Sequence, residues 1–338
     1  MSEEARPIRV MVVYGTRPEA IKMAPLVLAL QAADGIDCSV VVTGQHREML
    51  DQVNEVFGIT PDLDLDIFQA GQTLGDVTTR TLEGMAGAIA SLTPDAVLVQ
   101  GDTTTTFAAA LAAFYARVPV IHTEAGLRTD DKYSPFPEEI NRRLTTQLAD
   151  LHLAPTKKSR ANLLRDGVHP QAIQVTGNSV IDALLWTVGK QLPYSDERLA
   201  ARLELGRPTI LVTVHRRESW GEPMQAIGRA LATIAHHYPD HDLVFPVHRN
   251  PLVREAILPH VAGLENVIVT EPLPYGEFCQ LMARSTIILT DSGGVQEEGP
   301  SLGKPVLVMR ENTERPEAVE FGTVKLVGTD EQKIIAGI

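Results

Sequence analysis

Short runs of apolar, β-branched residues alternate with longer Ala- and Leu-rich segments along almost the whole chain. Each short run is nearly continuous in apolar residues, which is typical of parallel strands buried on both faces. The predicted strands are Val10–Tyr14, Cys38–Thr43, Ala96–Gln100, Val118–His122, Thr209–Val214, Asp242–Val247, Val267–Thr270, Thr286–Thr290 and Val306–Met309. Predicted helices include Pro18–Ala33, Thr104–Ala116 and Met224–His237. This rhythm predicts an α/β protein with parallel sheets.

The order of elements occurs twice. In the first half, VLVQGDTTTT leads into an Ala-rich helix and then VPVIHTEAGLR; in the second, IILTDSGGVQEE leads into a short helix and then KPVLVMRENTERPE. Any two βαβ units share this order, so the repeat alone is a weak signal. We expect two Rossmann-like domains, residues 1–176 and 177–338. Ligands bind beyond the carboxyl ends of parallel strands, so two facing domains would share one cleft site.

Composition narrows the classes of function. The 338 residues include 30 basic and 43 acidic ones, a net charge of −13, which argues against a nucleic-acid partner. Cys38 and Cys279 are isolated, so neither a disulfide framework nor a cysteine metal site is indicated. No apolar run reaches the roughly 18 residues of a membrane span. The acidic N-terminus, MSEEARPIRV, is unlike a signal peptide, and we expect a cytoplasmic protein without a membrane partner.

The segment GTRPEAIKMAPL joins a predicted strand to a helix. Arg17 and Lys22 lie around the helix N-terminus, where free N–H groups and the helix dipole favour an anion. One interpretation is a diphosphate contact. The other is a surface pair between Arg17 and Glu19, with Lys22 in solvent; the segment alone does not decide between them.

The segment Asp291-Ser292-Gly293-Gly294 also joins a strand to a helix. Ser292 could cap the helix, and the glycines Gly293 and Gly294 let the backbone approach a phosphate closely. Glu298 could bind ribose hydroxyls, as an acid does in dinucleotide folds. An ordinary capped helix with surface acids is the alternative, and it suits Glu297 better than Glu298.

Three acids follow other predicted strands: Asp102, Glu124 and Glu138. Asp102 could serve as a helix N-cap, and Glu138 could form an i,i+4 pair with Arg142. Glu124 comes just after the buried run VPVIH. The end of a buried strand is a poor structural place for an acid and a good catalytic one.

Two histidines end strands in the second half, His215 and His248, and each is followed by Arg. Such a histidine is usually structural, but two together raise the chance of a phosphate or acid–base role. His122 is expected to be structural. The sequence has no GxGxxG, P-loop, GxSxG or zinc-type spacing, so a nicotinamide cofactor or a metal is not indicated.

Long segments of this chain resemble the non-hydrolysing UDP-N-acetylglucosamine 2-epimerases. In order, they are GTRPEAIKMAPL, TGQHREML, QGDTTTTFAAALAAFY, HTEAGLRT, SPFPEEINRR, VTGNSVIDAL, VTVHRRE, DSGGVQEEGPSLGKPVLVMR and TERPEAVEFGT. The match runs from about Val10 to the end of the chain. The resemblance implies the two-domain GT-B fold and the interconversion of UDP-GlcNAc and UDP-ManNAc without NAD or metal.

The resemblance also implies roles for individual residues. The implied catalytic group is Asp102, Glu124, Glu138 and His215. The implied substrate contacts are Arg17 and Lys22 at the diphosphate, His46 and Arg142 near the catalytic group, Ser292, Gly293 and Gly294 at phosphate, Glu298 at the ribose and Arg315 at the rest of the nucleotide-sugar.

The chemistry implied by the resemblance is elimination of UDP to 2-acetamidoglucal and its re-addition, which needs a base and an acid on opposite faces of the sugar. The resemblance further implies a homodimer that supplies ManNAc units for cell-envelope polysaccharide. Members of the family usually continue for some tens of residues, ending in a helix on the first domain, and we expect this chain to lack that helix.

Two other functions fit the same residues. A hydrolysing relative would release free ManNAc and UDP, and a nucleotide-sugar binding protein would not turn its ligand over. Analysis of the products distinguishes all three.

Overall fold

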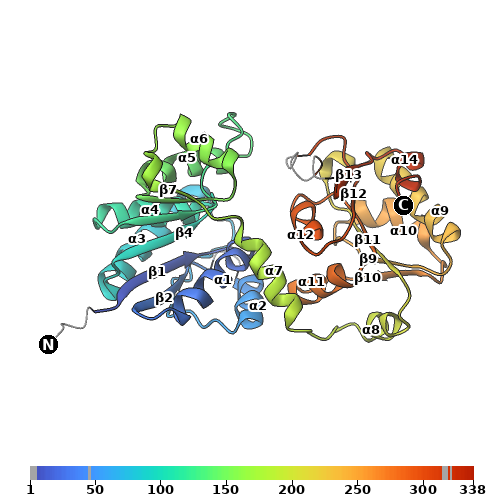
Figure 1. Cartoon of the computed structure of the whole chain (residues 1–338), viewed down its shortest axis with the longest axis horizontal. Coiled ribbons are helices and arrows are strands. Elements are labelled where there is room, and N and C mark those ends of the chain that lie inside the picture. Colours follow the sequence, from blue (N-terminus) through green and yellow to red (C-terminus); the bar gives the residue numbers. More distant parts are fainter. Residues whose placement is uncertain (1–5, 45–46, 314–318, 320–321) are drawn as a thin grey trace. The chain divides into compact units, whose positions relative to one another are not determined.

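The computed structural model describes residues 6–44, 47–313, 319 and 322–338. The chain divides into two compact units, Met1–Ala183 (unit 1) and Leu184–Ile338 (unit 2). Each unit is a parallel sheet with helices interleaved between its strands (Figure 1). The division falls within helix α7 (Ser179–Gly189), and the domain boundary after residue 176 stays a proposal.

Unit 1 contains, among its described residues, a seven-stranded parallel sheet in the order β3-β2-β1-β4-β5-β6-β7. Its strands are β1 (Ile8–Tyr14), β2 (Ile36–Val42), β3 (Leu63–Asp64), β4 (Ala96–Gln100), β5 (Val120–Thr123), β6 (Leu151–Ala154) and β7 (Ile173–Val175). The helices before α7 are α1 (Arg17–Ala32), α2 (Arg47–Phe57), α3 (Leu74–Leu92), α4 (Thr104–Tyr115), α5 (Glu138–Leu148) and α6 (Lys157–Arg165).

Unit 2 contains, over the part of it that the structure describes, a six-stranded parallel sheet in the order β10-β9-β8-β11-β12-β13. Its strands are β8 (Thr209–Thr213), β9 (Asp242–Pro246), β10 (Val267–Thr270), β11 (Ile287–Thr290), β12 (Val306–Val308) and β13 (Val324–Leu326). Its helices after α7 are α8 (Glu197–Glu204), α9 (Glu222–His237), α10 (Pro251–Val261), α11 (Tyr275–Arg284), α12 (Val295–Ser301) and α14 (Glu331–Ile335).

The strand orders of the two units follow one rule. In each, the first strand lies in the interior and the order reverses beside it, between β1 and β4 in unit 1 and between β8 and β11 in unit 2. This is the Rossmann-like arrangement, and its reversal point is where such sheets bind ligands. The prediction of two Rossmann-like units is therefore confirmed.

Every predicted strand is present, with ends that shift by at most two residues. The sequence analysis missed β3, β6, β7 and β13. Each has four residues or fewer, and three of them lie at the edge of a sheet, where few positions are buried and the apolar run is too short to recognise.

In unit 1 one hydrophobic cluster lies between the sheet and the helices α3 and α4. Met11 and Val13 of β1 pack with Met85 of α3 and with the Ala109 and Ala113 positions of α4. Because alanine side chains are small, the backbone of α4 packs close to the sheet. This packing fixes the position of the first residues of α4, just after the end of β4.

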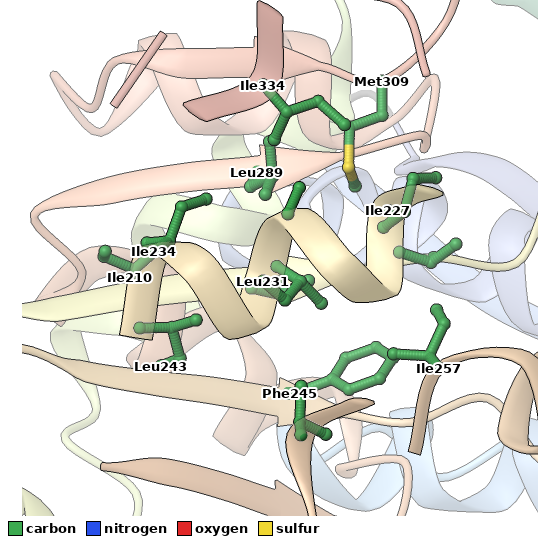
Figure 2. Packing of buried hydrophobic residues seen from close by; sticks show 14 of the residues in the cluster. Ile210, Ile227, Leu231, Ile234, Leu243, Phe245, Ile257, Leu289, Met309 and Ile334 are labelled. Atoms are coloured by element: carbon green, nitrogen blue, oxygen red, sulfur yellow. The ribbon is translucent and has the colours of Figure 1, made fainter. Parts of the chain in front are cut away.

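In unit 2 the core is built around helix α9, shown in Figure 2. Leu231 lies in the middle of its buried face, among side chains from β8, β9 and α10 such as Ile210, Phe245 and Ile257. Ile334 of α14 joins the same cluster and brings the end of the chain onto unit 2. Within the described ranges, no helix has both the length and the apolar character that a membrane crossing demands.

Replacing Leu231 by Ala should lower the free energy of unfolding of unit 2 by about 2–5 kcal/mol, because the side chain is 1% exposed and its removal leaves a cavity. Urea unfolding followed by circular dichroism measures the loss. Leu252→Ala on α10 is the control, because Leu252 is 48% exposed, and we expect a change below about 0.5 kcal/mol. Equal effects of the two substitutions would contradict this packing.

Candidate active site

The turns that follow β1, β4 and β5 meet at the reversal point of the sheet in unit 1. They carry Gly15, Asp102 and Glu124, respectively. Gly15 is needed for this approach, because a Cβ atom there would lie 2.0 Å from Thr43 Oγ1 and 2.7 Å from Thr105 Oγ1. The sheet thus gathers at one edge residues that are far apart in the sequence.

Glu124 is held by two donors. Lys22 Nζ of α1 lies 2.5 Å from Glu124 Oε2, and Gln100 Nε2 at the end of β4 donates to the same oxygen at 2.6 Å. The Glu124 side chain is 10% exposed and the residue has φ +56°, a left-handed conformation that few non-glycine residues adopt. The interpretation that Lys22 is solvated is therefore wrong.

Asp102 forms an ion pair with Arg142 of α5, with Oδ2 and Nη2 2.5 Å apart. Burial raises the pKa of Asp102 to about 6, against the opposing charge of Arg142. The nearby carboxylates Glu124 and Glu138 add to the rise. Asp102 can therefore gain or lose a proton close to neutral pH, which suits an acid–base group.

Two local interpretations of these acids are wrong. The N-cap of α4 is Thr103, whose side chain accepts from the Thr106 N–H at 3.1 Å, so Asp102 does not cap the helix. Arg142 contacts Asp102 and, at 3.5 Å, Glu139 rather than Glu138. Glu138 begins α5, and its buried Oε2 has no hydrogen-bond partner within the described part of the chain.

Glu19 is a functional candidate that the sequence analysis treated only as a surface partner of Arg17. It is 4% exposed. Its Oε2 accepts from the backbone N–H groups of Gly15 and Thr16 at 3.0 and 2.8 Å. Its Oε1 accepts from the Thr103 hydroxyl at 2.6 Å. Glu19 therefore ties the turn after β1 to the turn after β4, and the surface-pair interpretation is wrong.

A sequence signal for Glu19 exists. Thr16 and Glu19 have the spacing of a capping box, and the structure shows the Thr16 backbone N–H bonded to the Glu19 carboxylate. The box accounts for the bonds within α1. The bond to Thr103 joins segments 84 residues apart, which local sequence does not reveal.

In unit 2 the reversal point brings His215, after β8, to Asp291, after β11. His215 Nδ1 lies 2.9 Å from Asp291 Oδ1. Asp291 is fully buried, and its Oδ2 accepts from the backbone N–H groups of His215 and Arg216, both at 2.8 Å. The His248 ring stacks on that of His215, with centroids 6.1 Å apart.

The glycine-containing turn follows directly after Asp291. Ser292 does not cap α12, which begins after Gly294 and has no side-chain cap. Instead, the Ser292 N–H donates to Thr290 Oγ1 at 2.9 Å, and its carbonyl accepts from Gln296 Nε2 at 3.1 Å. These bonds shape a turn with glycines at 293 and 294, and a Cβ at Gly294 would come within 3.7 Å of Glu298.

The other predicted site residues are placed as follows. Arg17 is half-buried at the first position of α1 and forms no ion pair with the described residues. His46 and Arg315 lie outside the described residues. His122 is buried, with Nε2 2.7 Å from the Gly101 carbonyl oxygen, as a structural histidine would be. Among the described residues, no group of three or more His, Cys, Asp or Glu could hold a metal ion.

Two Rossmann-like units, each with polar residues at its reversal point, define an α/β protein of the GT-B type. A family model described as UDP-N-acetylglucosamine 2-epimerase matches residues 28–338. The UDP-N-acetylglucosamine 2-epimerase of Escherichia coli K12 is 56% identical over 334 residues, 97% of this chain and 89% of that protein.

Solved structures agree with the sequence comparison. The UDP-GlcNAc 2-epimerase of Neisseria meningitidis bound to UDP-GlcNAc has a TM-score of 0.83 and 49% identity, covering 98% of this chain and 90% of that one. The UDP-GlcNAc 2-epimerase of Methanocaldococcus jannaschii has a TM-score of 0.86 and 33% identity, covering 97% and 91%. The chain belongs to the UDP-N-acetylglucosamine 2-epimerase family.

Replacing Asp102 by Asn should stabilise the protein near pH 7. Between its ordinary pKa of 3.8 and about 6, the folded protein keeps a proton that the unfolded chain has lost, so the contribution of Asp102 to stability falls as the pH rises. The free energy of unfolding of the Asn variant should be higher by about 1–3 kcal/mol near pH 7 and little changed below the ordinary pKa. In this variant Arg142 keeps its Glu139 contact at 3.5 Å. Urea unfolding across this pH range measures the difference.

Asp95→Asn is the matched control. Its carboxylate accepts hydrogen bonds from Arg6 and from the Arg9 N–H, and these hold its pKa below the ordinary value. The same substitution should therefore lower stability near pH 7. Higher stability of both variants near pH 7 would contradict the explanation that the raised pKa of Asp102 destabilises the native protein.

Proposed function

We propose that this protein interconverts UDP-N-acetylglucosamine and UDP-N-acetylmannosamine by inverting C2 of the sugar, without releasing free sugar. The observation that carries the proposal is the pair of carboxyl groups at the reversal point of unit 1. Glu124 is paired with Lys22 at 2.5 Å, whereas burial raises the pKa of Asp102 to about 6. The two acids therefore differ in environment, as a base and an acid in one reaction should.

The proposed route is elimination followed by re-addition. A base removes the C2 proton, and the C1–O bond to UDP breaks with its electron pair moving to the diphosphate. The product is 2-acetamidoglucal with a C1–C2 double bond. Protonation of C2 from the opposite face and return of the UDP oxygen to C1 give the epimer. No atom is lost and the sugar is neither oxidised nor reduced overall.

The catalytic group in this proposal is Asp102, Glu124, Glu138 and His215. Glu138 has a buried oxygen without a hydrogen-bond partner in the described part of the chain. Arg142 stabilises ionised Asp102 at 2.5 Å.

Binding of the substrate is assigned to cations and to backbone groups. Arg17 and Lys22 would neutralise the departing diphosphate, and His46 would lie near the reacting sugar. The turn of Ser292, Gly293 and Gly294 would accept a phosphate.

Two residues complete the proposed contacts. Glu298 would bind the ribose hydroxyls through its carboxylate oxygens, and Arg315 would contact the nucleotide-sugar. We further propose a cytoplasmic homodimer that supplies ManNAc units for cell-envelope polysaccharide.

Incubation with UDP-GlcNAc in heavy water, followed by NMR of the sugar, tests the reaction. We expect deuterium at C2 and a pool of UDP-ManNAc. Free ManNAc with UDP would indicate the hydrolysing reaction instead, and binding without exchange would indicate a binding protein.

Glu124→Gln should abolish deuterium incorporation at C2, because a neutral amide neither accepts nor donates the C2 proton. UDP binding, measured by calorimetry, should remain within roughly threefold, which is about 0.7 kcal/mol. Glu255→Gln on the exposed face of α10 is the control and should behave as the native protein. Native exchange rates in the Glu124 variant would remove Glu124 from the mechanism.

A further inference from the structure

We propose that Asp291 is a positioning residue that fixes the tautomer of His215, with the proton on Nδ1 and with Nε2 free to exchange a proton with the substrate. This inference rests on the proposed catalytic role of His215. The sequence predicted Asp291 only as the first residue of a segment that joins a strand to a helix. In this proposal it acts through another side chain, that of His215.

The sheet itself brings the two residues together. β8 and β11 are neighbours in register, with Thr213 opposite Thr290, and their hydroxyl oxygens lie 2.5 Å apart. His215 follows Thr213 by two residues and Asp291 follows Thr290 by one. Both therefore leave the sheet at its reversal point, where ligands bind in this fold.

The carboxylate of Asp291 cannot turn away from His215. Its Oδ2 accepts two backbone N–H bonds at 2.8 Å, from His215 and Arg216, and this directs Oδ1 to His215 Nδ1 at 2.9 Å. Arg216 Nε also donates to the Asp291 carbonyl oxygen at 3.3 Å. The loop that carries His215 and the acid that faces it are thus one bonded unit.

The charge state of Asp291 supports this role. Burial alone would raise its pKa, but the bonds from the His215 ring and from the two backbone N–H groups outweigh burial and lower it. An ionised carboxylate has only acceptor positions. Buried Oδ1 has no hydrogen bond among the described residues, so the nearby Nδ1, 2.9 Å away, is the donor available to it when it carries the proton.

The consequence concerns the second ring nitrogen. With Nδ1 protonated, neutral His215 presents the lone pair of Nε2, and the imidazolium formed when Nε2 takes a proton is stabilised by the buried charge. The His215 side chain is 38% exposed, so the ring is accessible. The same logic operates in catalytic Ser-His-Asp groups.

Other polar groups lie around the His215 ring. His248 stacks on it from the loop after β9, and the pKa of His248 is lowered by burial and by His215. His248 Nδ1 accepts the Asn250 N–H at 3.1 Å, and Arg254 donates to the His248 carbonyl at 3.2 Å. Among these groups, Asp291 is the carboxylate in contact with the His215 ring.

Asp291→Asn tests the tautomer directly. The amide oxygen can keep both backbone N–H bonds, whereas the amide NH₂ then faces Nδ1 and demands an acceptor there. Ring ¹⁵N shifts of histidine-labelled protein report the proton position, and His215→Asn identifies the signals that belong to His215. We expect neutral His215 to carry its proton on Nδ1 in the native protein and on Nε2 in the variant.

Enzyme activity gives a further readout. We expect kcat of Asp291→Asn to fall by at least about 100-fold while KM for UDP-GlcNAc changes less than about threefold. Adding Asp291→Asn to His215→Asn should cost little more activity, because both act through one group.

Asp242→Asn is the matched control. Asp242 is also buried in unit 2, but it pairs with Arg202 at 2.8 Å. This control should leave the His215 signals unchanged, and an altered tautomer in it would point to general loosening of the unit. Nε2 protonation of neutral His215 in the native protein would overturn the proposal without any variant.

The two proposals fail in different ways. A native protein without epimerase activity overturns the proposed function and leaves the tautomer result standing. Native activity that survives His215→Asn removes His215 from the reaction. Activity that depends on His215 but not on Asp291 overturns this inference alone.

Discussion

A buried carboxylate that accepts backbone N–H groups holds the reversal point of each sheet. Glu19 bonds the turn after β1 and reaches Thr103 after β4, and Asp291 bonds the turn after β8 from the end of β11. Turns at the ends of parallel strands expose N–H groups that no neighbouring strand satisfies. Closing them with an internal acid gives each unit a fixed polar edge, on which the side chains proposed to act on the substrate are mounted.

The fold was largely predictable because its signal is local. Continuous apolar runs such as Ala96–Gln100 and Val267–Thr270 match β4 and β10 in every residue, since strands buried on both faces leave few polar interruptions. The edge strand β13, with three residues and Lys325 at its centre, carries no such run. Strand order was not readable, because it depends on which strands pair and not on any one segment.

The candidate site was predictable in its residue types and not in its pairings. The position of Glu124 after VPVIH marked it as unusual, yet its partner Lys22 lies 102 residues away in the sequence. The local sequence predicted Asp102 as the N-cap of α4 and Arg142 as the i,i+4 partner of Glu138. In the structure Thr103 caps α4, and Arg142 pairs with Asp102. Contacts made across a sheet prevail over those offered by a single helix.

The left-handed backbone of Glu124 (φ +56°) restricts which sequences can occupy that position. Asn, Asp and Gly adopt this conformation most readily, but their side chains are shorter than that of Glu and would end farther from the Lys22 ammonium. Val, Ile and Thr would be strained there. A replacement at this turn must therefore satisfy two constraints. Its backbone must adopt the left-handed conformation, and its side chain must be long enough to contact Lys22, so few substitutions for glutamate are compatible with both.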